Sequence, residues 1–483
     1  MASTGTVTSS GTNIDIDSIV SKLMSIEQTS VTKLQNQASA IQSQVSAVGT
    51  VKSLLSTLSD AATALTQPAL WATKTASASS SAVGVKVSDS SLASTGSFQV
   101  TVSQLARSQS VSSSAMASTD GFQAGTLSIQ LGTWSGTTGS SPGFAAGSTS
   151  AVDVAISEGD TLSTVASKIN AAGAGVTASV VTDLSGQRLV MRSSGTGDAA
   201  GFKVSAAGSG SGTSLGGLAF DAPGTGAGMA ANSVQWAANS VATVDGVTVT
   251  SATNTVTGAL PGLSLTLSQI STDPVTVTSS IDTTTLTNAV QGFVNAFNNI
   301  NTQINSLTSY DATSKKAGLM QGDSMVTGLQ TMMRRLVGTP NASGTYTTLS
   351  QLGISVSKSA DGSLTVDSAK LDAALANPDA VKTFFMGAGG AGATDATDGW
   401  ASRFSTFTQG AVGTDGSLDT RTASLQKQLK ANSDDQTKQT DRLTLTESRL
   451  RAQYSALDAK LSTLTTLDTY VKQQIAQWNK SGS

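Results

Sequence analysis

The stretch LRAQYSALDAKLSTLTTLDTYVKQQIAQW, residues 450–478, decides the fold of this chain. Its seam residues recur at alternating steps of four and three, with Asp468 at the one polar place: Leu450, Tyr454, Leu457, Leu461, Leu464, Val471, Ile475 and Trp478. This 3.5-residue repeat predicts a helix whose apolar seam meets another helix. At about 1.5 Å per residue the helix is roughly 40 Å long, too long to be buried in one small domain. It needs a partner.

A matching amphipathic helix is predicted near the N-terminus. Its seam has one irregular step after Val48 and consists of Leu34, Ala38, Ile41, Val45, Val48, Val51, Leu55, Leu58, Ala62 and Leu65. A second apolar face precedes it: Ile16, Ile19, Val20, Leu23, Met24 and Ile26. We expect Thr29-Ser30-Val31 to interrupt the helix and Gln67-Pro68 to end it. The chain therefore begins and ends in helices, and the rest is an insertion between them.

The insertion starts with strands and returns to helices. Period-two alternation predicts strands around 83–87, 98–102, 127–131, 152–156, 176–182, 188–192, 241–249, 263–267 and 275–277, with Asp245-Gly246 as a hairpin turn. One helix, 161–172, interrupts them, with Asp160 as N-cap and Gly173 at its end. From Thr284 onward, helices are predicted at 284–307, 324–337, 368–376, 379–385 and over most of 400–429, with a hairpin around Asp361-Gly362.

Composition excludes several classes of function. Cysteine and histidine are both absent, so the chain has no disulfide framework, no Cys/His zinc site and no Ser-His-Asp triad. The net charge of −3 gives no reason to expect nucleic acid or an anionic membrane surface as a partner. No apolar run reaches the ~18–20 residues of a membrane span, and residues 1–13 lack the features of a cleaved secretion signal. We expect no enzymatic activity, no cofactor, no metal and no membrane insertion.

Four features have two interpretations each. The acid pairs Glu158/Asp160 and Asp434/Asp435 could be hydrolase carboxylates, but capping at a helix start and a solvated helix face explain them better. The Gly-rich segment 208–228 is interpreted as a flexible surface loop, since it lacks the GK[ST] of a phosphate-binding loop. Trp134 and Trp236 are either exposed contact residues or, as we favour, core residues. For Met332-Met333-Arg334-Arg335 we expect a core side and a solvated side of one helix.

Three stretches of the chain carry a recognisable signature: NIDIDSIVSKLMSIE (13–27), FVNAFNNINTQINSLTSYDATSKKAGLMQG (293–322) and LSQLGISVSKSADGSLTVDSAKL (349–371). They resemble the flagellar filament cap family, hook-associated protein 2, and they occur in the family's order. DTLSTVASKINAAGAGVTASVV (160–181) is similar to a module shared with some flagellins. Residues 133–150 and 208–232 resemble nothing comparable.

The resemblance implies an axial protein of the bacterial flagellum. Such a protein is exported by the flagellar type III apparatus with a cytoplasmic export chaperone. Outside the cell it assembles as a ring-like homo-oligomer at the filament tip, after contact with the hook–filament junction proteins. There it guides the folding and insertion of flagellin. Cell adhesion through a host glycan or mucin is a further candidate function.

The expected fold is an α+β multidomain protein with a terminal α-helical coiled coil, a mainly helical domain and two nested β-rich insert domains. The expected segments are an N-terminal leg helix (1–40) that pairs with a C-terminal leg helix (440–483), a helical core domain (41–75 with 281–439), an inner β-rich head (76–112 with 236–280) and an outer β-rich head (113–235).

We expect the leg seams to be the partner-binding surface. The candidate residues are Ile16, Ile19, Val20, Leu23, Leu34, Ile41, Leu450, Tyr454, Leu457, Leu461, Leu464, Val471, Ile475 and Trp478. The simpler alternative is that the two helices pack only on each other. Because a two-helix pair leaves half its circumference in water, we favour packing against neighbouring copies or the filament end as well.

Two other functions remain open at the sequence level. A different axial component, such as a junction protein or a flagellin-like subunit, would share the helical ends, although the 293–322 signature argues against it. An extracellular adhesin acting through residues 113–235 belongs to a different class.

Overall fold

The computed structural model describes residues 15–135, 142–221, 228–231, 234–313, 315–359, 361–387 and 398–480. The chain divides into two compact units. One, the helical unit, combines the N-terminal part up to Leu70 with the part from Thr283 onward, and the other, the β unit, is Trp71–Asp282. Helices dominate the first unit and strands the second. The expected α+β multidomain class is confirmed.

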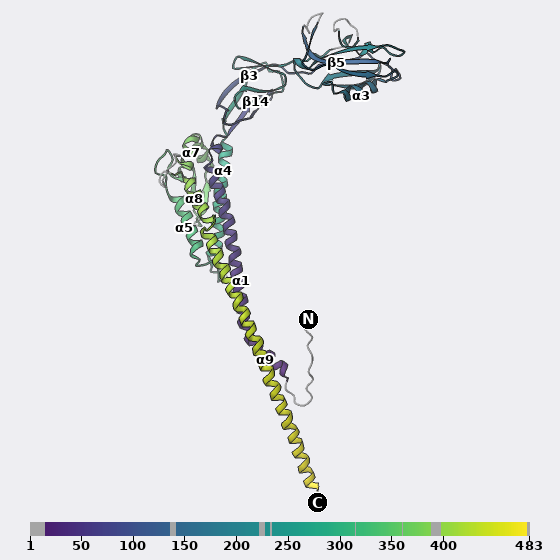
Figure 1. The fold of residues 1–483 in the computed structure, drawn as a ribbon. Helices are drawn as coiled ribbons and strands as arrows, with labels where there is room; N and C mark the ends of the chain where they lie inside the picture. Colours follow the sequence, from purple (N-terminus) through teal and green to yellow (C-terminus); the bar gives the residue numbers. More distant parts are fainter. Residues whose placement is uncertain are drawn as a thin grey trace. The chain divides into compact units, whose positions relative to one another are not determined.

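The helical unit contains two long helices and several short ones (Figure 1). Its helices are α1 (Ile16–Leu65), α4 (Thr283–Thr308), α5 (Ser324–Gly338), α6 (Ser368–Leu375), α7 (Pro378–Met386), α8 (Trp400–Val412) and α9 (Ser417–Lys480). Two small hairpins accompany them, β16 (Tyr310–Asp311) with β17 (Lys316–Ala317) and β18 (Ile354–Val356) with β19 (Leu364–Val366). The short helix α2 (Pro68–Trp71) follows α1.

The C-terminal half of α1 forms one side of the core of this unit. Val51, Leu55 and Leu58 are fully buried there, where α1 packs against α4, α8 and α9. Aromatic residues of α4 and α8 fill the centre, with ring centroids of Phe293 and Trp400 4.9 Å apart and nearly perpendicular. The Trp400 indole Nε1 donates a hydrogen bond to the Leu336 carbonyl at 3.0 Å, so the buried indole is satisfied. Met333 is buried in the same unit while its neighbour Met332 is exposed, as the sequence predicted.

Two helix boundaries differ from the prediction. Thr29-Ser30-Val31 does not interrupt α1. Val31 packs in an apolar cluster, which favours a continuous helix, and the Thr29 hydroxyl is satisfied by the Ser25 carbonyl. The helical region predicted over 400–429 is instead divided between α8 and α9. The break lies at Gly413–Gly416, where Asp415 has a φ of +62°. A Cβ at Gly416 would come within 2.6 Å of the Ala411 carbonyl oxygen, so this turn requires glycine.

The β unit contains two lobes, one nested in the sequence of the other. The inner lobe has a five-stranded sheet in the order β1-β15-β3-β11-β12 and a three-stranded sheet in the order β13-β14-β2. Its strands are β1 (Lys74–Ala78), β2 (Val83–Val87), β3 (Gly96–Gln104), β11 (Ser240–Val244), β12 (Val247–Ser251), β13 (Thr255–Leu260), β14 (Leu263–Leu267) and β15 (Val275–Ile281). Their inward residues, such as Val100, Leu265 and Val277, form one core.

The outer lobe has two further sheets and the helix α3 (Leu162–Ala172). Its strands are β4 (Ser110–Ser112), β5 (Gly125–Ser135), β6 (Gly143–Ala146), β7 (Val152–Ile156), β8 (Val176–Asp183), β9 (Gly186–Ser193) and β10 (Gly201–Gly208). β5 pairs with β10, β6 and β7, and β9 pairs with β4 and β8, all antiparallel. Leu127, Ile169 and Met191 lie in the common core.

Local details of the β unit confirm some predictions and correct others. The Asp245-Gly246 turn joins β11 to β12, and both residues have positive φ, as a type I′ hairpin turn requires. Gly173 ends α3 in the left-handed conformation. The N-cap of α3, however, is Thr161 and not Asp160. Asp160 instead accepts from the Ser157 N–H at 2.8 Å and pairs with Lys168, so it closes the turn before the helix.

The outer lobe also buries residues that the sequence placed in loops. The Gly-rich segment 208–228 was predicted to be a flexible surface loop, yet Leu215, Leu218 and Phe220 are buried in the core. Residues 222–227 of this segment lie outside the described residues. Trp134 is buried and its indole donates to the Phe202 carbonyl at 2.9 Å. Trp236 is half-buried, with its ring centroid 5.7 Å from that of Trp134. The core interpretation of both tryptophans is therefore confirmed.

Candidate partner-binding surface of the terminal helices

The helices α1 and α9 lie side by side and run in opposite directions (Figure 1). Three polar contacts between them define the alignment. From one contact to the next, the residue number rises along α1 and falls along α9, as expected for antiparallel helices. These contacts join Asp17 to Arg451, Gln37 to Asn432 and Lys52 to Asp419. The two ion pairs, Asp17–Arg451 and Lys52–Asp419, are accessible to solvent, and each pair of this kind stabilises a fold by only about 0–1 kcal/mol. They therefore indicate the alignment of the two helices more than its strength.

A small apolar cluster holds the outer part of this pair together. Val20 and Met24 of α1 and Leu443 of α9 are buried in it, and Ile16, Val31, Leu450 and Tyr454 pack around them. Burial of one such side chain stabilises the pair by about 1.5–3 kcal/mol. A groove remains beside the cluster, lined by Met24, Val31, Leu443 and polar neighbours such as Thr440. The two helices thus cover each other only in part.

Charges surround the cluster near the start of α1. The Asp15 carboxylate accepts from the Ser18 N–H at 2.9 Å and so caps the helix. The Arg451 guanidinium donates to the Asp17 carboxylate at 2.5 Å and to Glu447 at 3.0 Å. These two hydrogen bonds, that to Asp17 first, raise the pKa of Arg451 above its ordinary value. This arginine therefore keeps its charge at the edge of the seam.

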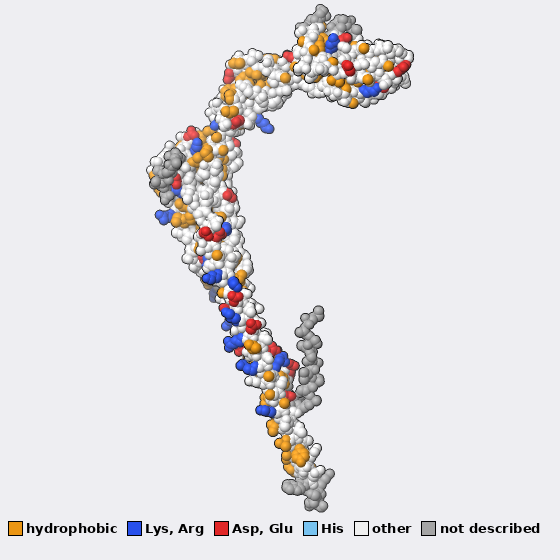
Figure 2. Space-filling view, viewed as in Figure 1, with side chains coloured by type: hydrophobic (Ala, Val, Ile, Leu, Met, Phe, Trp, Pro, Cys, Tyr) orange, Lys and Arg blue, Asp and Glu red, His pale blue; other side chains and the backbone are white. Residues whose placement is uncertain are grey.

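Beyond Tyr454 the apolar seam of α9 is largely uncovered. α1 begins at Ile16, close to Arg451, so the described part of α1 does not reach the last third of α9. Leu464 is 60% exposed and Ile475 is 51% exposed there. Figure 2 shows hydrophobic side chains gathered toward the C-terminal end of α9, whereas charged side chains are frequent along the part that pairs with α1. An exposed apolar seam of this length is typical of a surface that binds another protein.

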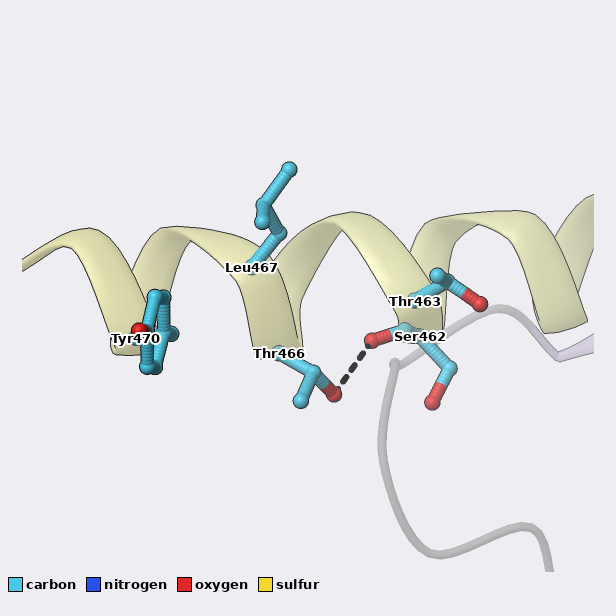
Figure 3. A pocket seen from close by; sticks show the side chains of 5 residues that line it. All are labelled: Ser462, Thr463, Thr466, Leu467 and Tyr470. Carbon is cyan, nitrogen blue, oxygen red and sulfur yellow. Dashed lines mark hydrogen bonds between the residues drawn. The ribbon is translucent and has the colours of Figure 1, made fainter.

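The exposed stretch carries apolar side chains on more than one side of the helix. Figure 3 shows a shallow hollow lined by Ser462, Thr463, Thr466, Leu467 and Tyr470, in which Leu467 projects to the other side of the helix from Thr466. The Thr466 hydroxyl donates to the Ser462 carbonyl, so it is satisfied within its own helix. Asp468 pairs with Lys472 at 2.7 Å, four residues on. The polar position in the seam is thus neutralised locally.

The predicted site residues fall into three groups. Val20 and Ile41 are buried, and a second group is half-buried: Ile16, Ile19, Leu34, Leu450, Tyr454 and Leu461. The exposed group is Leu23, Leu457, Leu464, Val471 and Ile475. The side chain of Trp478 lies outside the described residues, as do residues 1–14.

Sequence reasoning missed two members of this surface. Leu443 belongs to the buried cluster, and its position seven residues before Leu450 continues the heptad, so the same repeat could have identified it. Asn432 is buried against α1 and accepts from Gln436 at 2.6 Å. A polar residue at a seam position carries no comparable signal in the sequence.

Family models match most of the chain. Residues 12–109 match the model for the N-terminus of flagellar hook-associated protein 2, and residues 237–466 match the model for its C-terminus. Residues 135–195 match the flagellin hook IN motif. The B-type flagellar hook-associated protein 2 of Pseudomonas aeruginosa is 31% identical over 425 residues, which are 84% of each chain. This chain belongs to the flagellar hook-associated protein 2 family.

Other members of the hook-associated protein 2 family agree with this assignment. The Escherichia coli K12 protein is 29% identical over 486 residues, 96% of each chain. The crystal structure of the D1-D2-D3 domains of the Escherichia coli flagellar cap protein FliD superposes with a TM-score of 0.54 at 27% identity, covering 79% of this chain and 99% of that one. The resemblance noted in the sequence is confirmed, and the function is that of a flagellar filament cap. A different axial role and a primary role as adhesin are not favoured.

Two further findings concern the described residues alone. No helix among them is long and apolar enough to cross a membrane. Within the same ranges, acidic side chains nowhere gather in a group of three or more that could hold a metal ion.

Proposed function

We propose that this chain forms a ring-like homo-oligomer at the filament tip and that its terminal helices bind outside their own fold. The observation that carries the proposal is the uncovered seam of α9, above all Leu457, Leu464 and Ile475. Each of these side chains would contribute about 1.5–3 kcal/mol when buried. A closed ring also gives every copy the same contacts and prevents open-ended polymerisation.

In this proposal the segments have separate tasks. The outer part of α1 and the last third of α9 act as a leg that packs on neighbouring copies and on the filament end. Each task belongs to one segment of the chain: the legs 1–40 and 440–483, a helical core and two nested heads. The heads, 76–112 with 236–280 and 113–235, form the cover under which exported flagellin folds and inserts. Release of one leg contact at a time would open one site for each new subunit.

The proposed export route and location of the protein follow from this task. It leaves the cell through the flagellar type III apparatus, where an export chaperone covers the apolar helices that would otherwise aggregate. It then meets the hook–filament junction proteins and remains outside the cell at the growing end.

Charge substitutions in the seam test the leg hypothesis. Replacing Leu457, Leu461 and Leu464 together with Asp should abolish filament growth and release flagellin monomer into the medium, because charges cannot be buried in an apolar contact. The matched control places the same three charges on the opposite face of the same helix, at the exposed positions Ala452, Ser455 and Ala459. The control should grow filaments, and both variants should keep the strand signal of the β unit. Normal swimming by the seam variant would end the hypothesis.

The ring is tested separately. Electron microscopy of the purified full-length chain should show closed rings of constant size. Open tubes that lengthen with concentration would contradict a cap and favour a filament-forming protein.

A further inference from the structure

The two lobes of the β unit are joined by two chain crossings. The chain leaves the inner lobe after β3 and returns before β11, and these two segments pair with each other. The Arg107 N–H donates to the Ala238 carbonyl at 2.9 Å, and the Ala238 N–H donates to the Arg107 carbonyl at 3.1 Å. Ser110 and Gln235 pair in the same way. A two-stranded ribbon alone bends and twists easily.

A third connection is not covalent. The loop between β9 and β10 of the outer lobe, residues 194–200, reaches the inner lobe at two places. The Thr196 hydroxyl donates to the Ala252 carbonyl at 2.7 Å, in the turn between β12 and β13. Asp198 and Asn239 hold each other by three hydrogen bonds, since Asp198 accepts from the Asn239 N–H at 3.0 Å and from its side-chain amide at 2.7 Å and donates its own N–H to the Asn239 side-chain oxygen at 3.0 Å.

Gly197 allows this loop to approach so closely. Its φ is +92°, a conformation that side chains disfavour. A Cβ at this position would come within 2.7 Å of the Ala252 Cα and 2.8 Å of the Ala252 carbonyl oxygen. The Gly197 N–H also donates to the Arg107 carbonyl at 3.2 Å, which ties the loop to the crossing segment. Glycine here serves the contact between lobes and not the core of either.

We propose that Thr196, Gly197, Asp198, Asn239 and Ala252 form an interlobe clamp that locks the two β lobes in one orientation. The clamp resists bending because its contact at Ala252 lies away from the two-stranded ribbon, while Asp198 fixes Asn239 at the point where the ribbon enters β11. Its hydrogen bonds are partly exposed, so each is weak alone, but the three at Asp198 and Asn239 require one relative position of the two chains. The clamp rests on these contacts and does not depend on the proposed action of the cap.

The exchange of two side chains tests the clamp. In Asp198→Asn the new amide group faces the amide group of Asn239, and in Asn239→Asp two carboxylates face each other. Each single change therefore removes the hydrogen bond between the two side chains. The double variant D198N/N239D restores all three bonds with the roles of the partners reversed. Coupling of this kind is what a double-mutant cycle detects.

The readout is the distance between the lobes. Because the chain has no cysteine, two spin labels can be placed at will in the full-length protein through Ala171→Cys on the outer lobe and Thr248→Cys on the inner lobe. Both single variants should shift or broaden the label-to-label distance distribution, and the double variant should return it to that of the parent. Asp183→Asn is the matched control, since Asp183 bonds only within the β8–β9 hairpin among the contacts described for it. It should leave the distribution unchanged.

The outcomes separate clearly. An unchanged distribution in both single variants would overturn the clamp, and so would a double variant that is as broad as the singles. Far-UV circular dichroism of every variant shows whether the lobes themselves stay folded. A loss of the strand signal in the singles that the double variant does not recover would also count against the clamp, since the contact would then maintain one lobe and not the junction.

Discussion

Asparagine side chains on one face of α4 hold the β18–β19 hairpin in place. Asn298 donates to the Leu364 carbonyl at 2.9 Å and accepts from the Leu364 N–H at 2.7 Å. Asn301 and Asn305 both donate to the Asp361 carbonyl, at 2.9 and 3.0 Å. The spacing of three and four residues places all three amides on one side of the helix. This contact gives a physical reason for the asparagines in the stretch FVNAFNNINTQIN.

The buried member of this stripe should matter most. Asn301 is 1% exposed, and Asn301→Ala removes a buried amide that donates to the Asp361 carbonyl and accepts from Gln330, at a cost of about 0.5–1.5 kcal/mol in local stability for each lost hydrogen bond. The amides of β18 and β19 should then exchange their hydrogens faster in a native-state exchange experiment. Asn299→Ala makes the same change in helix propensity at an exposed position of α4 and should leave that exchange as it is. Equal effects of both substitutions would refute the role of the stripe.

The turn of the same hairpin predicts a pH dependence. The Ser363 N–H, then the hydroxyls of Ser363 and Ser359, donate to the Asp361 carboxylate and lower its pKa below the ordinary 3.8. A lowered folded-state pKa means that the stabilisation is complete above 3.8 and is lost as the pH falls below that value through the folded-state pKa. Thermal unfolding of the chain, followed by circular dichroism from about pH 5 downward, should show this loss. Asp361→Asn should flatten that part of the pH profile, and an identical profile would contradict the assignment.

At the scale of elements, the α1–α9 pair contains two regions of different stability. The C-terminal half of α1 is buried against several helices, whereas its outer part relies on the cluster of Val20, Met24 and Leu443. Between them lies the polar contact of Gln37 with Asn432. A short apolar cluster that is separated from the main core by polar residues opens by itself. The leg is thus expected to open while the rest of the unit stays folded.

A single core substitution can test this division. Val20→Ala removes two buried methyl groups, a loss of roughly 2 kcal/mol, and should speed hydrogen exchange in the first four turns of α1. Exchange around Leu55 and Leu58 should stay unchanged. The control is Lys22→Ala, an exposed position in the same turn. Uniformly faster exchange along the whole of α1 would show one cooperative helix instead.

The sequence predicted the elements of this fold better than their partners. The strong hydrophobic periodicity of α1, α4 and α9 was sufficient to predict helices, because the amphipathic spacing of a helix is visible in its own sequence whichever elements it packs against. Strand β10 was missed, since small residues such as Gly201 and Ala206 weaken the period-two pattern where it pairs with β5. The α9 seam could be predicted as an apolar surface. Which part of it α1 covers depends on where α1 begins, and the heptad repeat does not contain that information.

At the scale of the whole molecule, the β unit is inserted into the helical unit through neighbouring strands. β1 pairs with β15, Lys74 opposite Ile281, and the Asp282 N–H donates to the Thr73 carbonyl at 3.0 Å. Antiparallel partners lie only about 4.5–5.5 Å apart, so both ends of the insertion meet at one place. Each unit therefore has what it needs to fold separately.

Excision should demonstrate this independence. Residues 71–282 expressed alone should give a strand-rich circular dichroism spectrum and a single cooperative unfolding transition. The complementary chain, with the insertion replaced by a short Gly/Ser linker, should keep a helical spectrum. An unfolded 71–282 segment would show that the insertion depends on the helical unit.

The discontinuous helical unit has a consequence for timing. The Thr63 hydroxyl of α1 lies 2.8 Å from that of Ser405 in α8, and 342 positions of chain separate these two residues. Contacts between such distant residues form late, because the intervening segment must first be brought to closure. A chain delivered with its N-terminus leading therefore completes its β sheets while α1 still lacks α8 and α9. The C-terminal residues of α8 and α9, which arrive last, thus set the moment at which α1 becomes fully packed.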